Sequence, residues 1–162
     1  MVLGHLDMSL KLGNLKISSS AFEPLGRIPR RNAGDGENLS PPLAWSGAPK
    51  DTKQFALVCF DPDAPLPHGF VHWVVYGIPP IVAGLVEGER PNAFVPGVNG
   101  AGRQGYIGPR PPKGHGPHHY YFWLYALDTD LGLAPGMSMN QLLDTIGPHI
   151  LEQSRLVGLY ES

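Results

Sequence analysis

Runs of β-branched and aromatic residues recur along the chain, and segments rich in proline and glycine separate them. Such runs are typical of strands, because branched and aromatic side chains pack well on a pleated sheet. The pattern predicts four or five strands, within residues 15–22, 54–60, 71–78, 119–127 and 155–161. Helical periodicity is scarce, so we expect mostly strands and loops.

One segment near the C-terminus has the spacing of a helix. Its apolar residues recur every three or four positions, at Met139, Leu142, Leu143, Ile146 and Ile150. Ser138 and Gln141 form an S-x-x-Q capping box at its start. Pro148 is expected to interrupt or kink the helix, because proline cannot continue the backbone hydrogen bonds.

Two long connections, residues 27–50 and 87–116, separate the predicted strands. Surface loops of this length on a rigid sheet usually carry function. The second contains Gly100–Gly105, which matches the G-x-G-x-x-G pattern of dinucleotide sites. That pattern works only between a strand and a helix, whereas Pro96 precedes it here and a proline-rich segment follows. We interpret these glycines as turn residues and expect no cofactor.

The charges limit the classes of partner. With 12 Lys and Arg against 14 Asp and Glu, the formal net charge is −2 at pH 7. Such a chain has no whole-molecule field to attract nucleic acid or an anionic membrane, so any anion site must be local. At 162 residues it has the size of one ordinary domain, and we expect residues 1–162 to fold as a single domain.

We infer the cellular compartment of the protein from features that the sequence lacks. Residues 1–16 show neither the basic start nor the apolar segment of a signal peptide. The longest apolar run, residues 55–60, is far shorter than the roughly 20 residues that cross a bilayer. Cys59 is the only cysteine, excludes an intramolecular disulfide, and is interpreted as a buried apolar side chain. We expect a cytoplasmic protein with no membrane span.

Three histidines, His115, His118 and His119, resemble a cluster of metal ligands. Structural zinc sites usually recruit thiolates, and the chain has one cysteine. On a strand, His118 and His119 would point to opposite faces, so one ion could not bind both without a bulge. We expect no metal site.

Polar side chains stand where three predicted strands begin or end. Asp61 follows the apolar run 54–60, and the next strand begins near His72. If these two strands pair antiparallel, Asp61 and His72 lie at the same end of the sheet. His118 begins a further strand, and its imidazole reaches the same edge if that strand runs parallel to the second.

Alternation along the last of these strands places His118 and Tyr120 on one face and His119 on the other. An Asp–His–His–Tyr cluster would then form a small polar cavity, walled by prolines that make its loops rigid before a ligand arrives. Imidazoles near a carboxylate have their charged form favoured and can donate to an anion. In the alternative interpretation, Asp61 caps a turn and the histidines are structural.

The same residues allow a second function. A hydrolase could use His118 or His72 as general base, with Asp61 as the orienting carboxylate. The sequence contains no G-x-S-x-G elbow and no evident nucleophile beside these histidines.

Two motifs in this order resemble the phosphatidylethanolamine-binding protein family, also called Raf kinase inhibitor-like proteins. They are D61-P-D-A-P65 followed by His72, and G108-P-R-P-P-K-G-H-G-P-H118-H-Y120. Residues 35–45, DGENLSPPLAW, and the chain length are similar to the compact bacterial branch. The resemblance extends from about residue 14 to 160 and the pair of motifs is highly specific.

The resemblance implies a mainly β fold, with a large antiparallel-rich sheet packed on a smaller one by Greek-key connections, a C-terminal helix and long Pro/Gly-rich loops. The family's anion pocket would fall on Asp61, Asp63, Pro65, Phe70, His72, Pro112, His118 and Tyr120. Members bind phosphate-like and small carboxylate anions and are regarded as binding or regulatory proteins. We therefore expect a small soluble protein that binds phosphoryl or carboxylate headgroups, such as phosphoethanolamine, and that is not an enzyme.

The sequence departs from the family motif at one position. His119 stands where arginine is usual, and alternation directs it away from the pocket, so we expect anion binding to survive while a structural ion pair is lost. Regulation of a partner protein is an additional expectation, although kinase inhibition depends on surfaces that fold alone does not imply. A homodimer is a further expectation, because symmetric dimers are the commonest oligomers.

Overall fold

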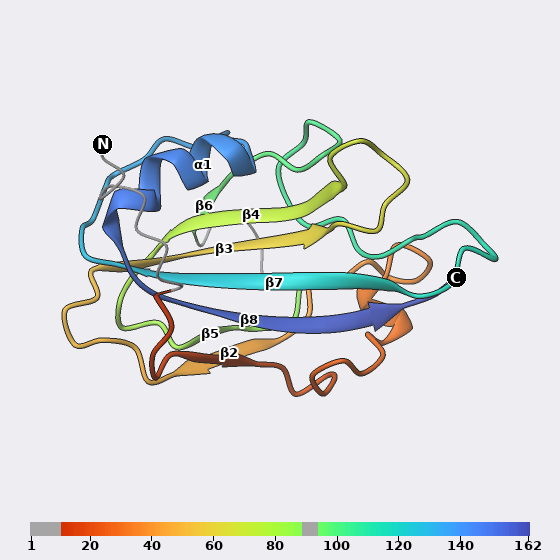
Figure 1. The fold of residues 1–162 in the computed structure, drawn as a ribbon, viewed down its shortest axis with the longest axis horizontal. Coiled ribbons are helices and arrows are strands. Elements are labelled where there is room, and N and C mark those ends of the chain that lie inside the picture. Colours follow the sequence, from red (N-terminus) through yellow and green to blue (C-terminus); the bar gives the residue numbers. More distant parts are fainter. Residues whose placement is uncertain (1–10, 89–93) are drawn as a thin grey trace.

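Two antiparallel sheets face each other in the computed structural model, which describes residues 11–88 and 94–162 (Figure 1). The larger sheet has the order β6 (Val95–Pro96), β4 (Phe70–Ile78), β3 (Gln54–Asp61), β7 (His118–Leu127) and β8 (Ile150–Tyr160). The smaller sheet has the order β1 (Lys16–Ser18), β2 (Leu43–Ser46) and β5 (Gly84–Leu85). The expected mainly β fold with a smaller second sheet is confirmed.

Strand β3 is buried on both faces, which explains its nearly continuous apolar sequence. Phe55, Leu57 and Cys59 face the smaller sheet and pack in the core between the two sheets. Ala56 and Val58 point the other way and pack in a second core beneath the helix. Burial, and then the charge of nearby Asp61, raises the pKa of the Cys59 thiol well above its ordinary value.

The central position of β3 fixes the directions of its neighbours. Both β4 and β7 pair antiparallel with it, so these two strands run parallel to each other and begin at the edge where β3 ends. Asp61 pairs with Phe70 in one ladder, and Phe60 pairs with Tyr121 in the other. The strand geometry predicted for Asp61, His72 and His118 is therefore confirmed.

The helix α1 (Met139–Ile146) covers the face of the larger sheet opposite the smaller sheet (Figure 1). Its capping box has the predicted geometry: Gln141 N donates to Ser138 Oγ at 3.2 Å, and Ser138 N donates to Gln141 Oε1 at 3.0 Å. A 3-10 turn, η4 (Gly147–His149), follows and contains Pro148. Ile150, expected in the helix, is instead the first residue of β8, because the turn redirects the chain.

Three short strands, β2, β5 and β6, were not predicted. β2 and β5 fall in segments interpreted as loops or left unassigned, and β6 falls in the connection 87–116, of which residues 89–93 lie outside the described residues. Another 3-10 turn, η2 (Arg30–Asn32), lies in the first long connection. Gly100–Gly105 form turns with no helix after them, which agrees with rejecting a dinucleotide site.

Replacing the N-cap residue tests the predicted helix start. Ser138→Ala is expected to lower the free energy of unfolding by about 1 kcal/mol, because the Gln141 N–H loses its acceptor. Ser138→Asp keeps an acceptor and is expected to remain near the wild type. Urea denaturation measures both, with Asn140→Ala in the same exposed first turn as the control. Equal stability of Ser138→Ala and Asn140→Ala would contradict the role of the cap.

Candidate functional site

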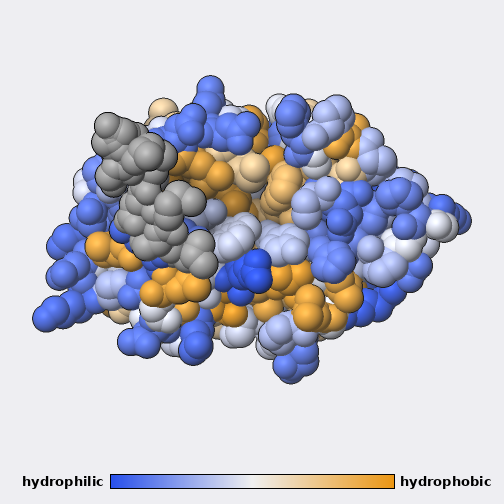
Figure 2. Space-filling model, viewed as in Figure 1, coloured by the Kyte–Doolittle hydropathy of each residue, from blue (hydrophilic) through white to orange (hydrophobic). Residues whose placement is uncertain are grey.

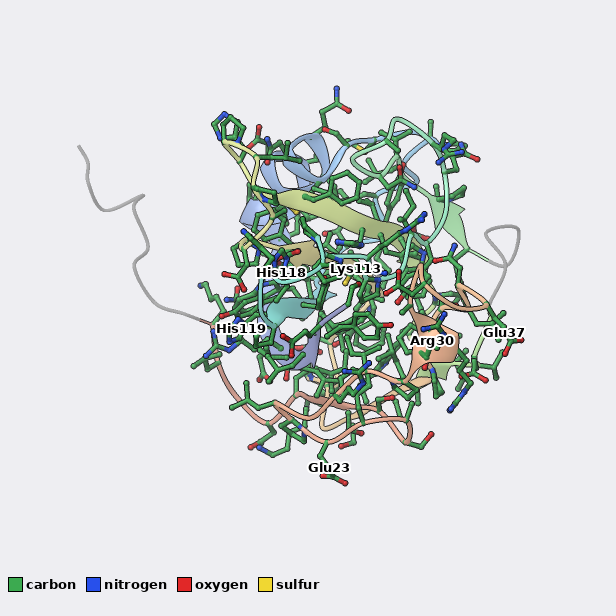
Figure 3. The ribbon with its side chains drawn as sticks, turned by 90° about the vertical axis from the view of Figure 1, so that its right-hand side faces the viewer. Glu23, Arg30, Glu37, Lys113, His118 and His119 are labelled. Atoms are coloured by element: carbon green, nitrogen blue, oxygen red, sulfur yellow. The ribbon has the colours of Figure 1, made fainter. Side chains whose placement is uncertain are left out.

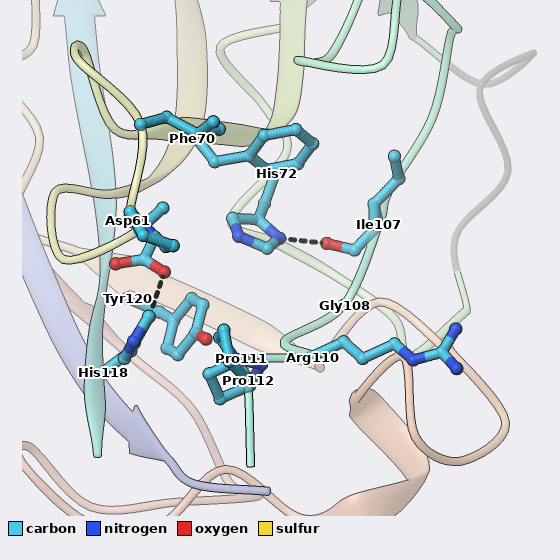
Figure 4. A pocket seen from close by; sticks show the side chains of 13 residues that line it. Asp61, Phe70, His72, Ile107, Gly108, Arg110, Pro111, Pro112, His118 and Tyr120 are labelled. Atoms are coloured by element: carbon cyan, nitrogen blue, oxygen red, sulfur yellow. Dashed lines mark hydrogen bonds and ion pairs between the residues drawn. The ribbon is translucent and has the colours of Figure 1, made fainter. Parts of the chain in front are cut away.

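A cavity of about 250 Å³ lies where β3 ends and β4 and β7 begin (Figure 4). The predicted pocket residues line it with one exception, Asp63. The lining consists of Asp61, Ala64, Pro65, Leu66, Phe70, His72, Ile107, Gly108, Arg110, Pro111, Pro112, His118 and Tyr120. The loops at this end of the molecule have a mainly hydrophilic surface at the right of Figure 2.

The carboxylate of Asp61 connects three segments of the site. It is buried, and its Oδ2 accepts a hydrogen bond from His118 Nδ1 at 2.7 Å. Its Oδ1 accepts a second hydrogen bond from the backbone N–H of Asp63 at 2.7 Å. A buried carboxylate is costly unless donors surround it, so these contacts hold the end of β3, the following loop and β7 in a fixed arrangement.

Tyr120 supplies a hydroxyl to the cavity. Burial, and then the charge of Asp61, raises the pKa of this hydroxyl well above its ordinary value. The hydroxyl points across the cavity toward Pro111 (Figure 4). Tyr120 therefore stays protonated at neutral pH and can act as a hydrogen-bond donor.

His72 lies on β4 and is held by the backbone of the opposite loop. Its Nδ1 donates to the carbonyl oxygen of Ile107 at 2.5 Å, which leaves Nε2 directed into the cavity (Figure 4). Burial lowers the pKa of His72 and outweighs the opposing effect of Asp61. The expectation that nearby carboxylates keep the imidazoles charged is therefore wrong for His72, which is neutral at pH 7 with a lone pair on Nε2.

His118 is buried and has both ring nitrogens engaged. Nδ1 contacts Asp61, and Nε2 lies 2.6 Å from Nδ1 of His115. His115 is exposed, so a chain of hydrogen bonds leads from the buried carboxylate to solvent. His115 was considered only as a metal ligand from the sequence, and its contact with His118 was not predicted.

Asp63 lies outside the cavity and forms a pair with His119. Its Oδ2 accepts from the backbone N–H of His119 at 2.8 Å and lies 2.7 Å from the His119 ring Nδ1. Burial acts to raise the pKa of Asp63, but the contacts with His119 outweigh it and hold the pKa below its ordinary value. The His119 side chain is 44% exposed and that of His118 only 2%, as alternation along β7 predicts, and Figure 3 labels both at this end of the molecule. The imidazole of His119 thus contacts a carboxylate beside the strand at the position where the family motif usually has arginine.

Aromatic and proline side chains complete the walls. The Phe70 ring meets the His72 ring edge-on, with centroids 4.9 Å apart. Gly100 gives this ring its space, because a Cβ there would come within 2.6 Å of Phe70. Prolines fix their own backbone angles and so stiffen the remaining walls, at Pro65, Pro111 and Pro112.

Several residues of the site were not predicted from the sequence. Ile107 and Arg110 line the cavity, and His115 contacts His118 from the same loop. These three lie in the Pro/Gly-rich segment that precedes β7, where composition indicates a rigid loop but not which side chains turn inward. The other unpredicted lining residues are Ala64, Leu66, Gly108 and Pro111. In the described ranges 11–88 and 94–162, no group of His, Cys, Asp or Glu residues has an arrangement that could hold a metal ion.

Two packed antiparallel sheets with a proline-walled cavity at their strand ends define a mainly β protein. The chain belongs to the phosphatidylethanolamine-binding protein family, whose family model matches residues 18–161. This match confirms the resemblance carried by the two motifs around Asp61 and His118.

Relatives of known sequence or structure agree with this membership. A UPF0098 protein from Methanothermobacter thermautotrophicus is 46% identical to this chain. The alignment covers 90% of this chain and 98% of that protein. The crystal structure of the family homolog CT736 from Chlamydia trachomatis has a TM-score of 0.87 and 37% identity, covering 93% of this chain and 99% of that one. LppC from Mycobacterium tuberculosis, which is named a lipoprotein, is 42% identical to this chain. The alignment covers 91% of this chain and 72% of LppC.

The cellular location of the protein stays a prediction. Among the described residues, none of the helices is both long enough and apolar enough to pass through a bilayer. The cytoplasmic location expected from the sequence is not tested by that finding, and LppC carries the name of a lipoprotein.

The Asp63–His119 pair predicts a pH-dependent contribution to stability. Because its folded pKa is lowered, Asp63 stabilises the fold above its unfolded pKa of about 3.9, and this stability is lost as the pH falls through the folded value. His119→Ala is expected to raise the Asp63 pKa and to reduce the stability lost on acidification. Carboxyl NMR titration and urea unfolding at neutral and acidic pH measure these changes.

The matched control is His149→Ala, which removes another partly exposed imidazole, 3.0 Å from Asp128. This variant is expected to leave the Asp63 titration unchanged. The same Asp63 pKa in both variants would contradict the assigned pair.

Proposed function

We propose that the protein binds a small anionic group, phosphoryl or carboxylate, in the cavity at the strand ends. The observation that carries the proposal is the convergence of His72 Nε2 and the Tyr120 hydroxyl on a hollow beside Asp61. The Asp61 carboxylate already accepts hydrogen bonds from His118 and Asp63, so its charge is partly compensated before a ligand enters. Rigid proline walls reduce the entropy lost when a ligand binds.

Anion binding at this site is coupled to the proton on His72. In the free protein burial keeps His72 neutral, whereas an anion beside Nε2 favours the imidazolium. The charges that face this ring are the Asp61 carboxylate, which favours protonation, and His118, which opposes it. A bound anion adds to the effect of Asp61, so His72 takes up a proton and donates through Nε2 while Nδ1 stays on Ile107.

The same geometry supports binding over hydrolysis. The described lining residues include no serine, threonine or cysteine, and the raised pKa makes the Tyr120 hydroxyl a poor nucleophile. Both ring nitrogens of His118 are engaged, by Asp61 and His115, so this histidine has no free nitrogen to accept a proton from water. A hydrolase at this site would have to use His72, whose lowered pKa makes it a weak general base.

A titration with sulfate tests the coupling, because sulfate does not change its own charge near neutral pH. Sulfate affinity is expected to fall by up to about tenfold per pH unit above the His72 pKa of the free protein. His72→Asn is expected to bind weakly and without this pH dependence. Calorimetry between about pH 5.5 and 8 measures both, and His149→Asn, at a partly exposed histidine outside the cavity, serves as the control.

Phosphate and phosphoethanolamine are the probes for the proposed ligand class. Millimolar concentrations of either are expected to shift the ring NMR signals of His72 and His118. If neither signal moves in the wild type and sulfate also fails to bind, the binding function is wrong. A pH dependence that survives in His72→Asn would instead contradict only the proton coupling.

The enzymatic alternative has its own test. Activated phosphate and carboxylate esters are expected to show no turnover above the uncatalysed rate, because the site lacks a nucleophile. Turnover by the wild type that disappears in His72→Asn would contradict the binding function and favour a hydrolase with His72 as base.

A further inference from the structure

The charge inside the cavity is poorly matched to an anion. Asp61 contributes a carboxylate, and His72 is neutral in the free protein. Of the lining residues within 11–88 and 94–162, only Arg110 carries a permanent positive charge. A ligand with two negative charges beside Asp61 therefore depends on this guanidinium far more than a ligand with one.

Arg110 lies at the rim and is not yet directed at a ligand. Its side chain leaves the edge of the cavity and extends away from Asp61 (Figure 4). Its Nε is 3.7 Å from Asp35 Oδ1, beyond hydrogen-bond distance, and its side chain is 77% exposed. Exposed ion pairs of this kind contribute little stability, so little holds the guanidinium where it lies.

Asp35 does not need Arg110 to remain satisfied. Its Oδ2 accepts hydrogen bonds from Ser162 Oγ at 2.6 Å and from Tyr160 at 3.2 Å. The Ser162 bond is the largest cause of an Asp35 pKa below its ordinary value. Arg30 also donates to the Asp35 carbonyl oxygen at 2.8 Å. The carboxylate stays ionised and bonded when Arg110 leaves it.

The backbone on either side of Arg110 is rigid. Pro109 precedes Arg110 and Pro111 follows it, so both neighbours have restricted backbone angles. A long side chain on a rigid backbone can change direction by rotating its own χ angles. The planar guanidinium can then donate two parallel hydrogen bonds to two oxygens of one phosphoryl group.

We propose that Arg110 determines specificity at this site by moving from Asp35 onto the ligand, and thereby selects a dianionic phosphoryl group over a monoanion. This inference rests on the proposed anion-binding function. Asp35 acts as an internal competitor, because it holds the guanidinium weakly when the cavity contains no ligand. A monoanion needs only the donors His72 and Tyr120 and gains less from the arginine.

Three probes of similar size separate the charge states. At pH 8 methyl phosphate is a dianion, since its second pKa is about 6, while dimethyl phosphate and acetate carry one charge. Arg110→Ala is expected to weaken methyl phosphate binding by about tenfold or more. Binding of the two monoanions is expected to weaken by no more than about threefold. Calorimetry or NMR titration of the folded variants gives the affinities.

Two variants control for general loss of positive charge. Lys113→Ala removes a charge from the same loop, and Arg30→Ala removes one beside Asp35; neither residue lines the cavity. Figure 3 shows both at the same end of the molecule as His118. Each is expected to change methyl phosphate affinity by less than about twofold, because screened exposed charges act weakly at a distance. A loss equal to that of Arg110→Ala would contradict a specific role for Arg110.

Asp35→Asn tests the competition directly. It is expected to strengthen methyl phosphate binding by about two- to threefold when Arg110 is present, and to have no effect in the Arg110→Ala background. Ser162→Ala, which removes the hydrogen bond from Ser162 to Asp35 but keeps the Asp35 charge, is the control for loosening of residues 160–162. An equal effect of Asp35→Asn in both backgrounds would contradict the exchange.

The outcomes separate this inference from the function on which it rests. A wild-type protein that binds none of the three probes contradicts the proposed anion site itself. A wild type that binds methyl phosphate as tightly after Arg110→Ala as before contradicts only the role of Arg110.

Discussion

The buried carboxylate of Asp61 is the contact on which the geometry of the site depends. Removing a charge from water is costly, and the protein offsets this cost with donors from the loop after β3 and from β7. Because β3 lies between β4 and β7, these donors can meet the carboxylate only at one edge of the sheet. The sheet order thus decides where a polar cavity can form, and the carboxylate decides how its walls are held.

The electrostatic character of the cavity follows from competition between burial and charge. Asp61 favours a protonated His72, yet loss of solvent around the ring outweighs this effect and lowers the pKa of the imidazole. The nearest permanent cation lies at the rim and faces a different carboxylate. If an anion binds as proposed, its affinity resides in two groups that change, the protonation state of His72 and the direction of the Arg110 side chain, between walls that proline stiffens.

Sequence reasoning predicted the long elements and the residues at their ends. β3, β4 and β7 are extended runs of branched and aromatic side chains, so Asp61, His72 and His118 could be placed at one edge by direction alone. β5 and β6 have two residues each, too short for any periodicity, and depend on pairing with longer strands. Capping chemistry marked the start of α1, but Ile150 was misassigned because helical spacing continued by chance beyond the turn at Pro148.

The rest of the site depends on distances that the sequence does not contain. Asp63 shares the motif of Asp61 but turns outward to His119, since two residues of a loop need not face the same way. The neutral state of His72 depends on how deeply its ring is buried, which the sequence does not give. The Asp35–Arg110 contact joins the two long connections, which are far apart in the sequence. Side chains at strand ends were predictable because strands alternate; loop side chains follow no such rule.

The thiol of Cys59 gives the protein an internal reporter. It is the only cysteine, lies in the core two positions before Asp61, and has a pKa raised by its surroundings. Alkylating reagents attack the thiolate, so the native state shields this sulfur both by contact and by protonation. The rate at which such a reagent modifies Cys59 would therefore report how often the central strands open. A ligand bound in the cavity beside Asp61 would slow this modification by keeping the strands closed.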